Sequence, residues 1–391
     1  IMDGRLLSRV TRVFTSIQLR CESNFHAKHL KFIPTSTPKP IPTTIPRFGA
    51  VSTDHMLEID YKEGVWQKPV IRPVEPLSIH PTAKVLHYCP TVFEGIKAFR
   101  GVDNEIRLFR IERNMERLLR SAKRAALPEF CTVQLEHMIE DLVRKEQEWV
   151  PSGDGTALYI RPFIMGTEAS LGVSTPTEAK LLVVCCPVGP YYASGWKPIT
   201  LYANPAHIRA APGGVGSYKM GCNYAPTIYI TDQASSLGCH QALWLWGEKQ
   251  WMTEAGTSNI FIFWKNTSDE LELITPPTSD GLILPGVTRE SIIILAKEWG
   301  EFKVTERYPT MKEVKEATEE GRVIEMFAAG TAAVVSPIQK IVYIEKNKTD
   351  PTIIEFPSQK KGNTLYERFH QTITGIQYGK IDRPDWIRIV D

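Results

Sequence analysis

Short apolar segments of strand length fill most of the chain from Met56 onward, and only a few helical patterns interrupt them. Apolar, β-branched runs bounded by turn residues predict strands, whereas apolar residues recurring every three or four positions predict helices. Strands and helices are mixed before Gly189, and strands dominate after Pro198. The pattern therefore predicts an α+β fold in two unequal lobes, the second of them strand-rich and barrel-like.

The expected elements follow from these patterns. In the first lobe we expect strands over residues 56–61, 106–110, 157–165 and 180–188, and helices over residues 112–126 and 135–150. In the second lobe we expect strands over residues 199–203, 227–233, 242–247, 259–264, 271–275, 322–328 and 341–344. Helices are expected there over residues 288–300 and 311–321.

The first 47 residues differ in composition from the rest of the chain. Residues 2–33 carry Arg and Ser, almost no acids and scattered apolar residues, which is typical of a mitochondrial transit peptide; a flexible basic arm is the alternative. Residues 34–46 hold five prolines among threonines and predict an extended linker. We therefore expect a tail and arm over 1–47, a small α/β domain over 48–189, an interdomain loop over 190–200 and a larger domain over 201–391.

Composition excludes several classes of protein. With 42% hydrophobic and 23% charged residues, the chain is neither disordered nor fibrous. The formal net charge of +2 calls for no nucleic-acid partner, and no apolar run reaches the roughly 18 residues that a membrane helix needs. Seven cysteines without a CxxC pair are typical of buried thiols in a reducing compartment.

The most suggestive segment for chemistry runs from Ala211 to Met220 and contains three glycines followed by Lys219. Its spacing fits neither a phosphate-binding P-loop nor a dinucleotide fingerprint. A lysine in a cleft shaped by glycines can lose its hydration, which lowers its pKa and leaves an amine able to form an imine. Taken alone, however, this segment favours an ordinary exposed loop lysine.

Two further patterns suggest places where charged groups are held. Glu254 opens an apolar strand, where a buried carboxylate needs a cationic partner such as a protonated pyridine nitrogen, although a turn glutamate is the plainer reading. The segments 284–289 and 329–332 read as turns next to helix starts, whose unpaired N–H groups can bind phosphate. Each of these segments taken singly is equally consistent with a plain turn.

Four arginines lie along one face of the helix expected over 112–126, namely Arg113, Arg117, Arg120 and Arg124. A solvated surface explains them best, and an RNA- or phosphate-binding face is the minority interpretation because no aromatic stacking pattern accompanies them. The scattered histidines give no metal-ligand spacing, and no GxSxG segment indicates a serine hydrolase.

Taken together, these segments resemble the branched-chain amino acid aminotransferases, which are pyridoxal-phosphate enzymes of fold type IV, and the animal forms, mitochondrial and cytosolic, are the most similar. The resemblance covers about Phe48 to Tyr378, and its specific motifs are GGVGSYKMGCNYAPTIYI, MTEAGTSNIFIFW, LILPGVTRESI and EMFAAGTAAVVSPI. It implies a two-lobed fold in which a small α/β domain precedes a larger pseudo-barrel domain carrying the cofactor lysine.

The resemblance also implies roles for individual residues around pyridoxal 5′-phosphate. Lys219 is expected to hold the cofactor as an imine and, once displaced by the substrate, to carry a proton between the substrate Cα and the cofactor C4′. Glu254 is expected to pair with the pyridine nitrogen, and Tyr224 with the phenolic oxygen of the ring. The expected phosphate contacts are Arg117, the amides of Val287 and Thr288, and Thr331.

The same resemblance places a substrate pocket and a partner subunit. The residues expected around the substrate are Phe48, Tyr88, Phe93, Tyr159, Arg161, Val173, Tyr191, Thr257 and Ala332. Tyr88 and Val173 are expected to come from the neighbouring subunit of a homodimer. Arg161 and Tyr88 would recognise the side-chain carboxylate of glutamate, and Thr257 with the Ala332 amide would hold the α-carboxylate.

The sequence departs from the pattern of this family in two places. The CxxC pair of mammalian members is replaced by Ala333 and Ser336, so thiol regulation is not expected there. Cys222 stands where glycine is usual; we expect a tolerated small residue, although a thiol there could crowd or oxidise beside Lys219.

The expected function is therefore transamination of L-leucine, L-isoleucine and L-valine with 2-oxoglutarate, in the mitochondrial matrix or alternatively the cytoplasm. It serves the biosynthesis and catabolism of branched-chain amino acids. The alternatives are a D-amino acid aminotransferase or aminodeoxychorismate lyase of the same fold, or a non-catalytic binding protein. No metal, nucleic acid or membrane is expected as a partner. Preference among the three amino acids is not readable, because one methylene is worth only about 1–3 kcal/mol.

Overall fold

The computed structural model describes residues 24–189, 197–345, 348, 350–357, 362 and 364–391. The chain forms two compact units. Unit 1 comprises the residues up to Gly189 together with Pro384–Asp391, and unit 2 comprises Pro190–Arg383.

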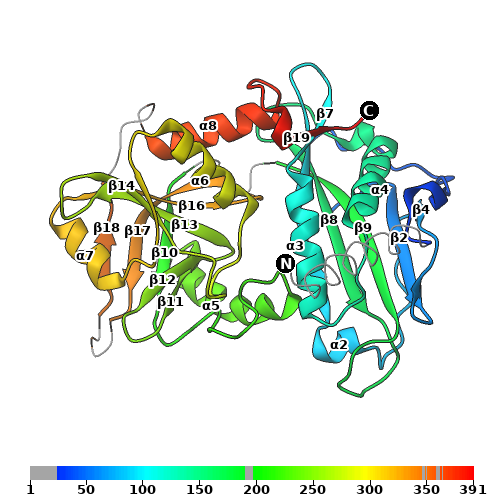
Figure 1. The fold of residues 1–391 in the computed structure, drawn as a ribbon, viewed down its shortest axis with the longest axis horizontal. Helices are drawn as coiled ribbons and strands as arrows, with labels where there is room; N and C mark the ends of the chain where they lie inside the picture. The colour runs from blue at the N-terminus through cyan, green and yellow to red at the C-terminus, as the bar shows by residue number, and fades with distance from the viewer. Residues whose placement is uncertain (1–23, 190–196, 346–347, 349, 358–361, 363) are drawn as a thin grey trace, which may run out of the picture. The chain divides into compact units, whose positions relative to one another are not determined.

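Unit 1 is built on one ten-stranded sheet in the order β1-β4-β2-β9-β8-β6-β7-β19, with β3 paired to β2 and β5 to β8. Its strands are β1 (Lys31–Phe32), β2 (His55–Lys62), β3 (Val65–Trp66), β4 (Val70–Pro73), β5 (Thr91–Phe93), β6 (Ile96–Arg100), β7 (Ile106–Phe109), β8 (Ala157–Gly166), β9 (Ala179–Val188) and β19 (Ile387–Ile389). Its helices are α2 (Lys84–Tyr88), α3 (Ile111–Arg124) and α4 (Thr132–Lys145), with the 3-10 turns η1 (Ala27–His29), η2 (Gln147–Trp149) and η4 (Pro384–Trp386). Figure 1 shows α3 and α4 lying across this sheet.

Unit 2 is built on a nine-stranded sheet in the order β12-β11-β10-β17-β16-β13-β14-β15, with β18 paired to β17. Its strands are β10 (Ile199–Ala203), β11 (Gln241–Trp246), β12 (Trp251–Ala255), β13 (Ser258–Lys265), β14 (Leu271–Thr275), β15 (Lys303–Glu306), β16 (Val323–Gly330), β17 (Val334–Tyr343) and β18 (Thr352–Glu355). Its helices are α5 (Ala225–Ser236), α6 (Val287–Trp299), α7 (Met311–Glu319) and α8 (Leu365–Gln377), with the 3-10 turn η3 (Gly221–Asn223).

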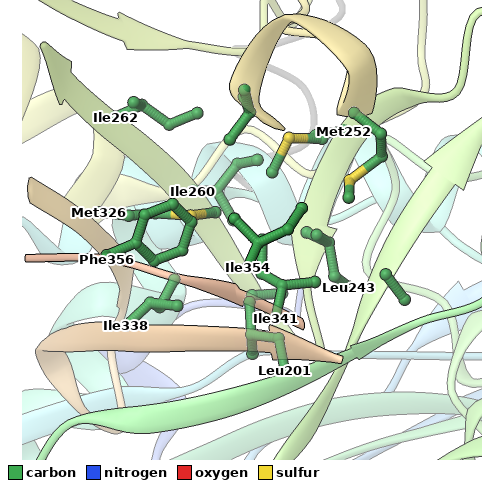
Figure 2. Packing of buried hydrophobic residues seen from close by; sticks show 14 of the residues in the cluster. Leu201, Leu243, Met252, Ile260, Ile262, Met326, Ile338, Ile341, Ile354 and Phe356 are labelled. Carbon is green, nitrogen blue, oxygen red and sulfur yellow. The ribbon is translucent and has the colours of Figure 1, made fainter. Parts of the chain in front are cut away.

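The sheet of unit 2 curls into a barrel because β12, at one end of the strand order, also pairs with β13. Figure 2 shows its interior, which is filled by aliphatic side chains of alternate strand positions, among them Leu201, Leu243, Ile260 and Ile341. The opposite face of β13 is also buried, since Phe261 stacks on Phe327 with ring centroids 5.1 Å apart. The expected α+β fold with a strand-rich, barrel-like second lobe is confirmed.

The strand expected over residues 227–233 is wrong, because these residues lie within helix α5. The run Thr-Ile-Tyr-Ile-Thr has strong strand propensity, yet Pro226 in the first helical turn favours a helix start. The helix buries only Ile230 and Ala234, four residues apart, against Trp244 and Ala242. The helix start at Pro226 has therefore outweighed the strand propensity of the run that follows it.

Both ends of the expected domain layout differ from the structure. The larger domain was expected to run to Asp391, but Pro384–Asp391 belong to unit 1, where β19 pairs with β7. At the other end, the expected tail contributes Phe25 to the core of unit 1: Phe25 is 1% exposed, and its ring lies 5.3 Å from that of Trp66. In the expected interdomain loop, residues 190–196 lie outside the described residues, and Ile199 and Thr200 already belong to β10.

The cysteines of the described residues are mostly unbridged, including Cys89, Cys185, Cys186 and Cys239. Burial raises the pKa of the Cys185 thiol well above its ordinary value. Cys131 is disulfide-bonded, so the expectation of thiols throughout is wrong at that position.

Candidate functional site

Lys219 lies in a loop whose conformation is stabilised by hydrogen bonds from a side chain of the same loop. The side-chain amide of Asn223 donates hydrogen bonds to the carbonyls of Val215 and Tyr218, both at 2.8 Å. Gly216 must be glycine, since a Cβ there would lie 2.4 Å from Ala210 and 2.8 Å from the carbonyl oxygen of Gly281. The Lys219 Nζ is thereby set 3.1 Å from the hydroxyl of Tyr224, at the start of α5.

Glu254, on β12, is a buried carboxylate with only 3% of its surface exposed. One of its oxygens accepts hydrogen bonds from the side chain of Asn259 at 3.0 Å and from the backbone N–H of Leu284 at 3.1 Å. Its other oxygen lies 2.7 Å from Nε of Arg209. The sequence required a cationic partner for this carboxylate, and within the protein Arg209 supplies one.

The two expected phosphate-binding turns both lie beside the hairpin that joins β12 to β13. Gly286 precedes the first turn of α6, and a Cβ on it would lie 2.1 Å from the side-chain oxygen of Asn259. Asn259 pairs with Ala329 of β16, and Gly330 lies against Ser258. The first-turn N–H groups of α6, those of Val287 and Thr288 among them, have no acceptor within the helix and favour an anion.

The remaining expected residues of unit 2 lie on the same turns. Thr257 is exposed at the tip of the β12–β13 hairpin, and Thr331 and Ala332 follow Gly330 with partly buried side chains. Unit 2 therefore brings together an amine, a phenol, a buried carboxylate and a helix start capable of binding phosphate.

Unit 1 gathers four of the expected substrate residues into one aromatic cluster. Tyr159 and Arg161 project from the same face of β8, and the guanidinium of Arg161 donates to the Tyr159 hydroxyl at 3.0 Å. The same guanidinium lies 4.8 Å from the ring centre of Phe93, and the ring of Phe48 meets that of Tyr159 edge-on at 4.9 Å. Gly95 makes room for this cluster, since a Cβ there would lie 2.1 Å from the Tyr159 hydroxyl.

Arg117 differs from the other arginines of α3. It is 8% exposed and makes a two-point ion pair with Glu94, with N–O distances of 2.7 and 2.8 Å. The side chain of Asn114 donates a further hydrogen bond to Glu94 at 2.8 Å. By contrast, Arg120 and Arg124 are exposed. This partner of Arg117 was missed from sequence, although Glu94 directly follows the expected site residue Phe93.

Tyr88 and Val173 lie on an exposed part of unit 1. The Tyr88 hydroxyl donates to the carbonyl of Leu171 at 2.5 Å, and Val173 is 82% exposed. Tyr191 lies outside the described residues. Of the two departures from the family pattern, Ser336 is buried in β17 and Cys222 is half-buried in η3.

Neither a metal centre nor a membrane-spanning helix is found in the described part of the chain. No group of three or more His, Cys, Asp or Glu side chains there is arranged to hold a metal ion. None of the helices formed by those residues is long and apolar enough to cross a bilayer.

The strand-rich barrel of unit 2, together with Lys219, Tyr224 and Glu254, is consistent with one class of enzyme. The family described as amino-transferase class IV matches residues 91–341, more than half of the chain, and the chain belongs to this class of pyridoxal-phosphate enzymes. A solved structure, the branched-chain amino acid aminotransferase of Thermobaculum terrenum in its PLP form, shares the fold with a TM-score of 0.66. It is 23% identical, and the match covers 86% of this chain and 98% of that one.

Curated relatives narrow the class to one family. The chain is 50% identical to the cytosolic branched-chain-amino-acid aminotransferase of Caenorhabditis elegans, over 90% of this chain and 85% of that protein. It is 45% identical to the mitochondrial enzyme of Rattus norvegicus, over 94% and 93% of the two chains. The chain belongs to the branched-chain-amino-acid aminotransferases. Cytosolic and mitochondrial relatives are both similar, so these matches do not separate the two forms.

Proposed function

We propose that this chain transfers the amino group of L-leucine, L-isoleucine and L-valine to 2-oxoglutarate, giving branched-chain 2-oxo acids and L-glutamate. The observation that carries the proposal is the 3.1 Å pair of Lys219 and Tyr224 within the same unit as the buried carboxylate of Glu254. Family membership supports the same reaction over the alternatives of the fold and over a non-catalytic protein.

The residues of unit 2 fit pyridoxal 5′-phosphate. When bound, the cofactor supplies an electron-withdrawing ring that eases loss of the substrate Cα proton. In this proposal the Lys219 Nζ would hold the cofactor and, once the substrate amine has displaced it, would move that proton between Cα and C4′. Tyr224 would donate to the phenolic oxygen, and Glu254 would accept from the ring nitrogen and keep it protonated.

The phosphate would be held by the amides of Val287 and Thr288, by Thr331 and by Arg117. Buried helix N–H groups and an arginine fixed by a carboxylate are strong phosphate ligands because little order is lost when they bind. The ion pair of Arg117 with Glu94 supports this assignment, since it fixes the guanidinium in one orientation.

The substrate pocket must accept an aliphatic side chain in one half-reaction and a carboxylate in the other. The aromatic rings of Phe48, Phe93 and Tyr159 suit the first, and Arg161, held against two of these rings, suits the second. The family resemblance assigns Tyr191, which lies outside the described residues, to the substrate, and we assign Thr257 with the Ala332 amide to the α-carboxylate.

The chain is proposed to act as a homodimer in the mitochondrial matrix. Tyr88, Leu171 and Val173 are all exposed, and Tyr88 bonds to Leu171, so they support a subunit contact because clustered exposed apolar side chains mark interaction surfaces. The basic, acid-poor composition of residues 2–33 supports a mitochondrial destination, with the cytoplasm as the alternative.

The test is an absorbance spectrum of the purified protein loaded with pyridoxal 5′-phosphate, recorded with and without L-leucine. Leucine should bleach the visible band of the bound cofactor as the pyridoxamine form accumulates, and 2-oxoglutarate should restore it. Lys219→Ala should abolish both the band and turnover. Full turnover by Lys219→Ala would refute the proposal.

A further inference from the structure

Arg209 lies in the loop between β10 and Lys219, where no sequence pattern marked it as functional. It is a buried arginine whose side chain is 7% exposed. Its Nε lies 2.7 Å from Glu254, and its Nη2 donates to the carbonyls of Gly216 at 3.0 Å and Leu282 at 2.7 Å.

These contacts join three segments that the proposed site needs. Gly216 belongs to the loop that carries Lys219, and Glu254 lies in β12. Leu282 lies in the segment that leads to α6. A guanidinium is a rigid planar group, so its two hydrogen bonds to backbone carbonyls and its ion pair with Glu254 constrain the relative positions of three segments.

The charge of Arg209 also acts on Glu254. Two further donors to this carboxylate, Asn259 and the Leu284 N–H, are neutral. A cation within hydrogen-bond distance favours the ionised carboxylate and makes it a weaker base. A proton shared between Glu254 and a pyridine nitrogen would therefore stay on the nitrogen.

We propose that Arg209 is a positioning residue for transamination, which holds Glu254 ionised and fixes the loop of Lys219 relative to it. This proposal rests on the proposed function, because it assumes that Glu254 faces the cofactor nitrogen. Arg209 acts through Glu254 and Gly216 and contacts no substrate.

Two substitutions separate its charge from its geometry. Arg209→Met removes both, so kcat should fall by about 10- to 100-fold. The KM for leucine should change less than about threefold because the pocket wall is untouched. The pH dependence of the visible cofactor band should also shift, because the basicity of Glu254 changes. Arg209→Lys keeps the charge but cannot make all three contacts of the guanidinium. Its kcat should therefore lie between those of the wild type and Arg209→Met.

A matched control is Arg289, an equally buried arginine of unit 2 that pairs with Glu306 and the Pro276 carbonyl instead. Arg289→Met should lower the melting temperature as Arg209→Met does, and leave the pH dependence of the band in place. If Arg209→Met lowers only the melting temperature, with kcat and the band unchanged, Arg209 is merely structural and the inference is overturned.

The outcomes also separate this inference from the proposed function. If the wild-type protein binds no cofactor, the proposed function is refuted. If Glu254→Gln leaves the band and turnover intact, the proposed role of Glu254 is refuted, whatever the effect of Arg209→Met. If Glu254→Gln lowers turnover while Arg209→Met does not, only the role of Arg209 fails.

Discussion

At the scale of single residues, the family resemblance predicts Lys219, Tyr224 and Glu254, and the structure shows that part of what holds them is local in sequence. Lys219 and Tyr224 are five residues apart in one loop, and Glu254 and Asn259 face each other across a hairpin. Arg209 and Glu94 could not be predicted in the same way. Their roles depend on contacts with segments 45 and 23 positions further along the chain, and such contacts leave no periodic pattern.

Gly95 is a residue-scale test of the aromatic cluster. A methyl group on Gly95 would lie 2.1 Å from the Tyr159 hydroxyl, so Gly95→Ala should push the ring aside and break its hydrogen bond with Arg161. We expect the KM for glutamate to rise by about tenfold, which corresponds to roughly 1.4 kcal/mol. Steady-state kinetics with glutamate and leucine measure this effect.

The companion variant for this test is Tyr159→Phe. Combined with Gly95→Ala, it removes the clashing oxygen. In free-energy terms, the rise in the KM for glutamate in the double variant should therefore be smaller than the sum of the two single effects. Wild-type kinetics for Gly95→Ala would show that the Tyr159 hydroxyl is not needed where the structure places it.

Lys97, on β6 beside Tyr159, gives a prediction about pH. Burial lowers the pKa of Lys97 from 10.5 to about 8, so between these values the unfolded chain binds more protons than the folded chain. The free energy of unfolding should therefore rise with pH over this interval, by up to about 3 kcal/mol. Chemical denaturation at pH 7.5 and 9.5, compared with Lys97→Met, measures the difference; an equal pH slope in both proteins would contradict it.

At the scale of elements, periodicity predicted the helices with a clear apolar stripe and failed where burial is slight. The pattern over residues 288–300 matches α6, which buries one continuous face. Helix α5 buries only two side chains, so its sequence was free to carry β-branched residues and was assigned to a strand. Short edge strands such as β1 and β19 have too few residues to show alternation.

Helix α7 offers a test at this scale, because a capping box closes its first turn. The Thr310 hydroxyl accepts from the Glu313 N–H at 3.1 Å, and the Glu313 carboxylate accepts from the Thr310 N–H. Thr310→Ala should lower the free energy of unfolding by about 1 kcal/mol, whereas Thr310→Ser should restore most of it. Denaturant titration decides this, and identical midpoints for wild type and Thr310→Ala would count against the cap.

At the scale of the whole molecule, strand content predicted the barrel but not the path of the chain. The closure of the barrel by β12 and β13 follows from a local hairpin. Residues 384–391 return to unit 1, where β19 pairs with β7, a strand far from it in sequence. Nothing in the sequence of either strand alone specifies this partner. The chain consequently passes between the two units twice.

Trp386 tests this return. Its indole is 4% exposed, packs edge-on against Phe109 with centroids 5.7 Å apart and lies beneath the guanidinium of Arg110. Trp386→Ala should destabilise unit 1 by about 3–5 kcal/mol through the cavity it leaves. Hydrogen exchange should then quicken in β6, β7 and α3 while β16 and β17 keep their protection; uniform protection throughout would show that the C-terminal strand contributes little.

The burial of Phe25 between Trp66 and Phe130 limits how far the amino end could be trimmed without damage to unit 1. A processing peptidase that cut beyond this ring would open a hole in unit 1 and take away the residues that lead into β1. If an import sequence is removed in the organelle, the new first residue should therefore precede Phe25, as amino-terminal sequencing of the mature enzyme would reveal.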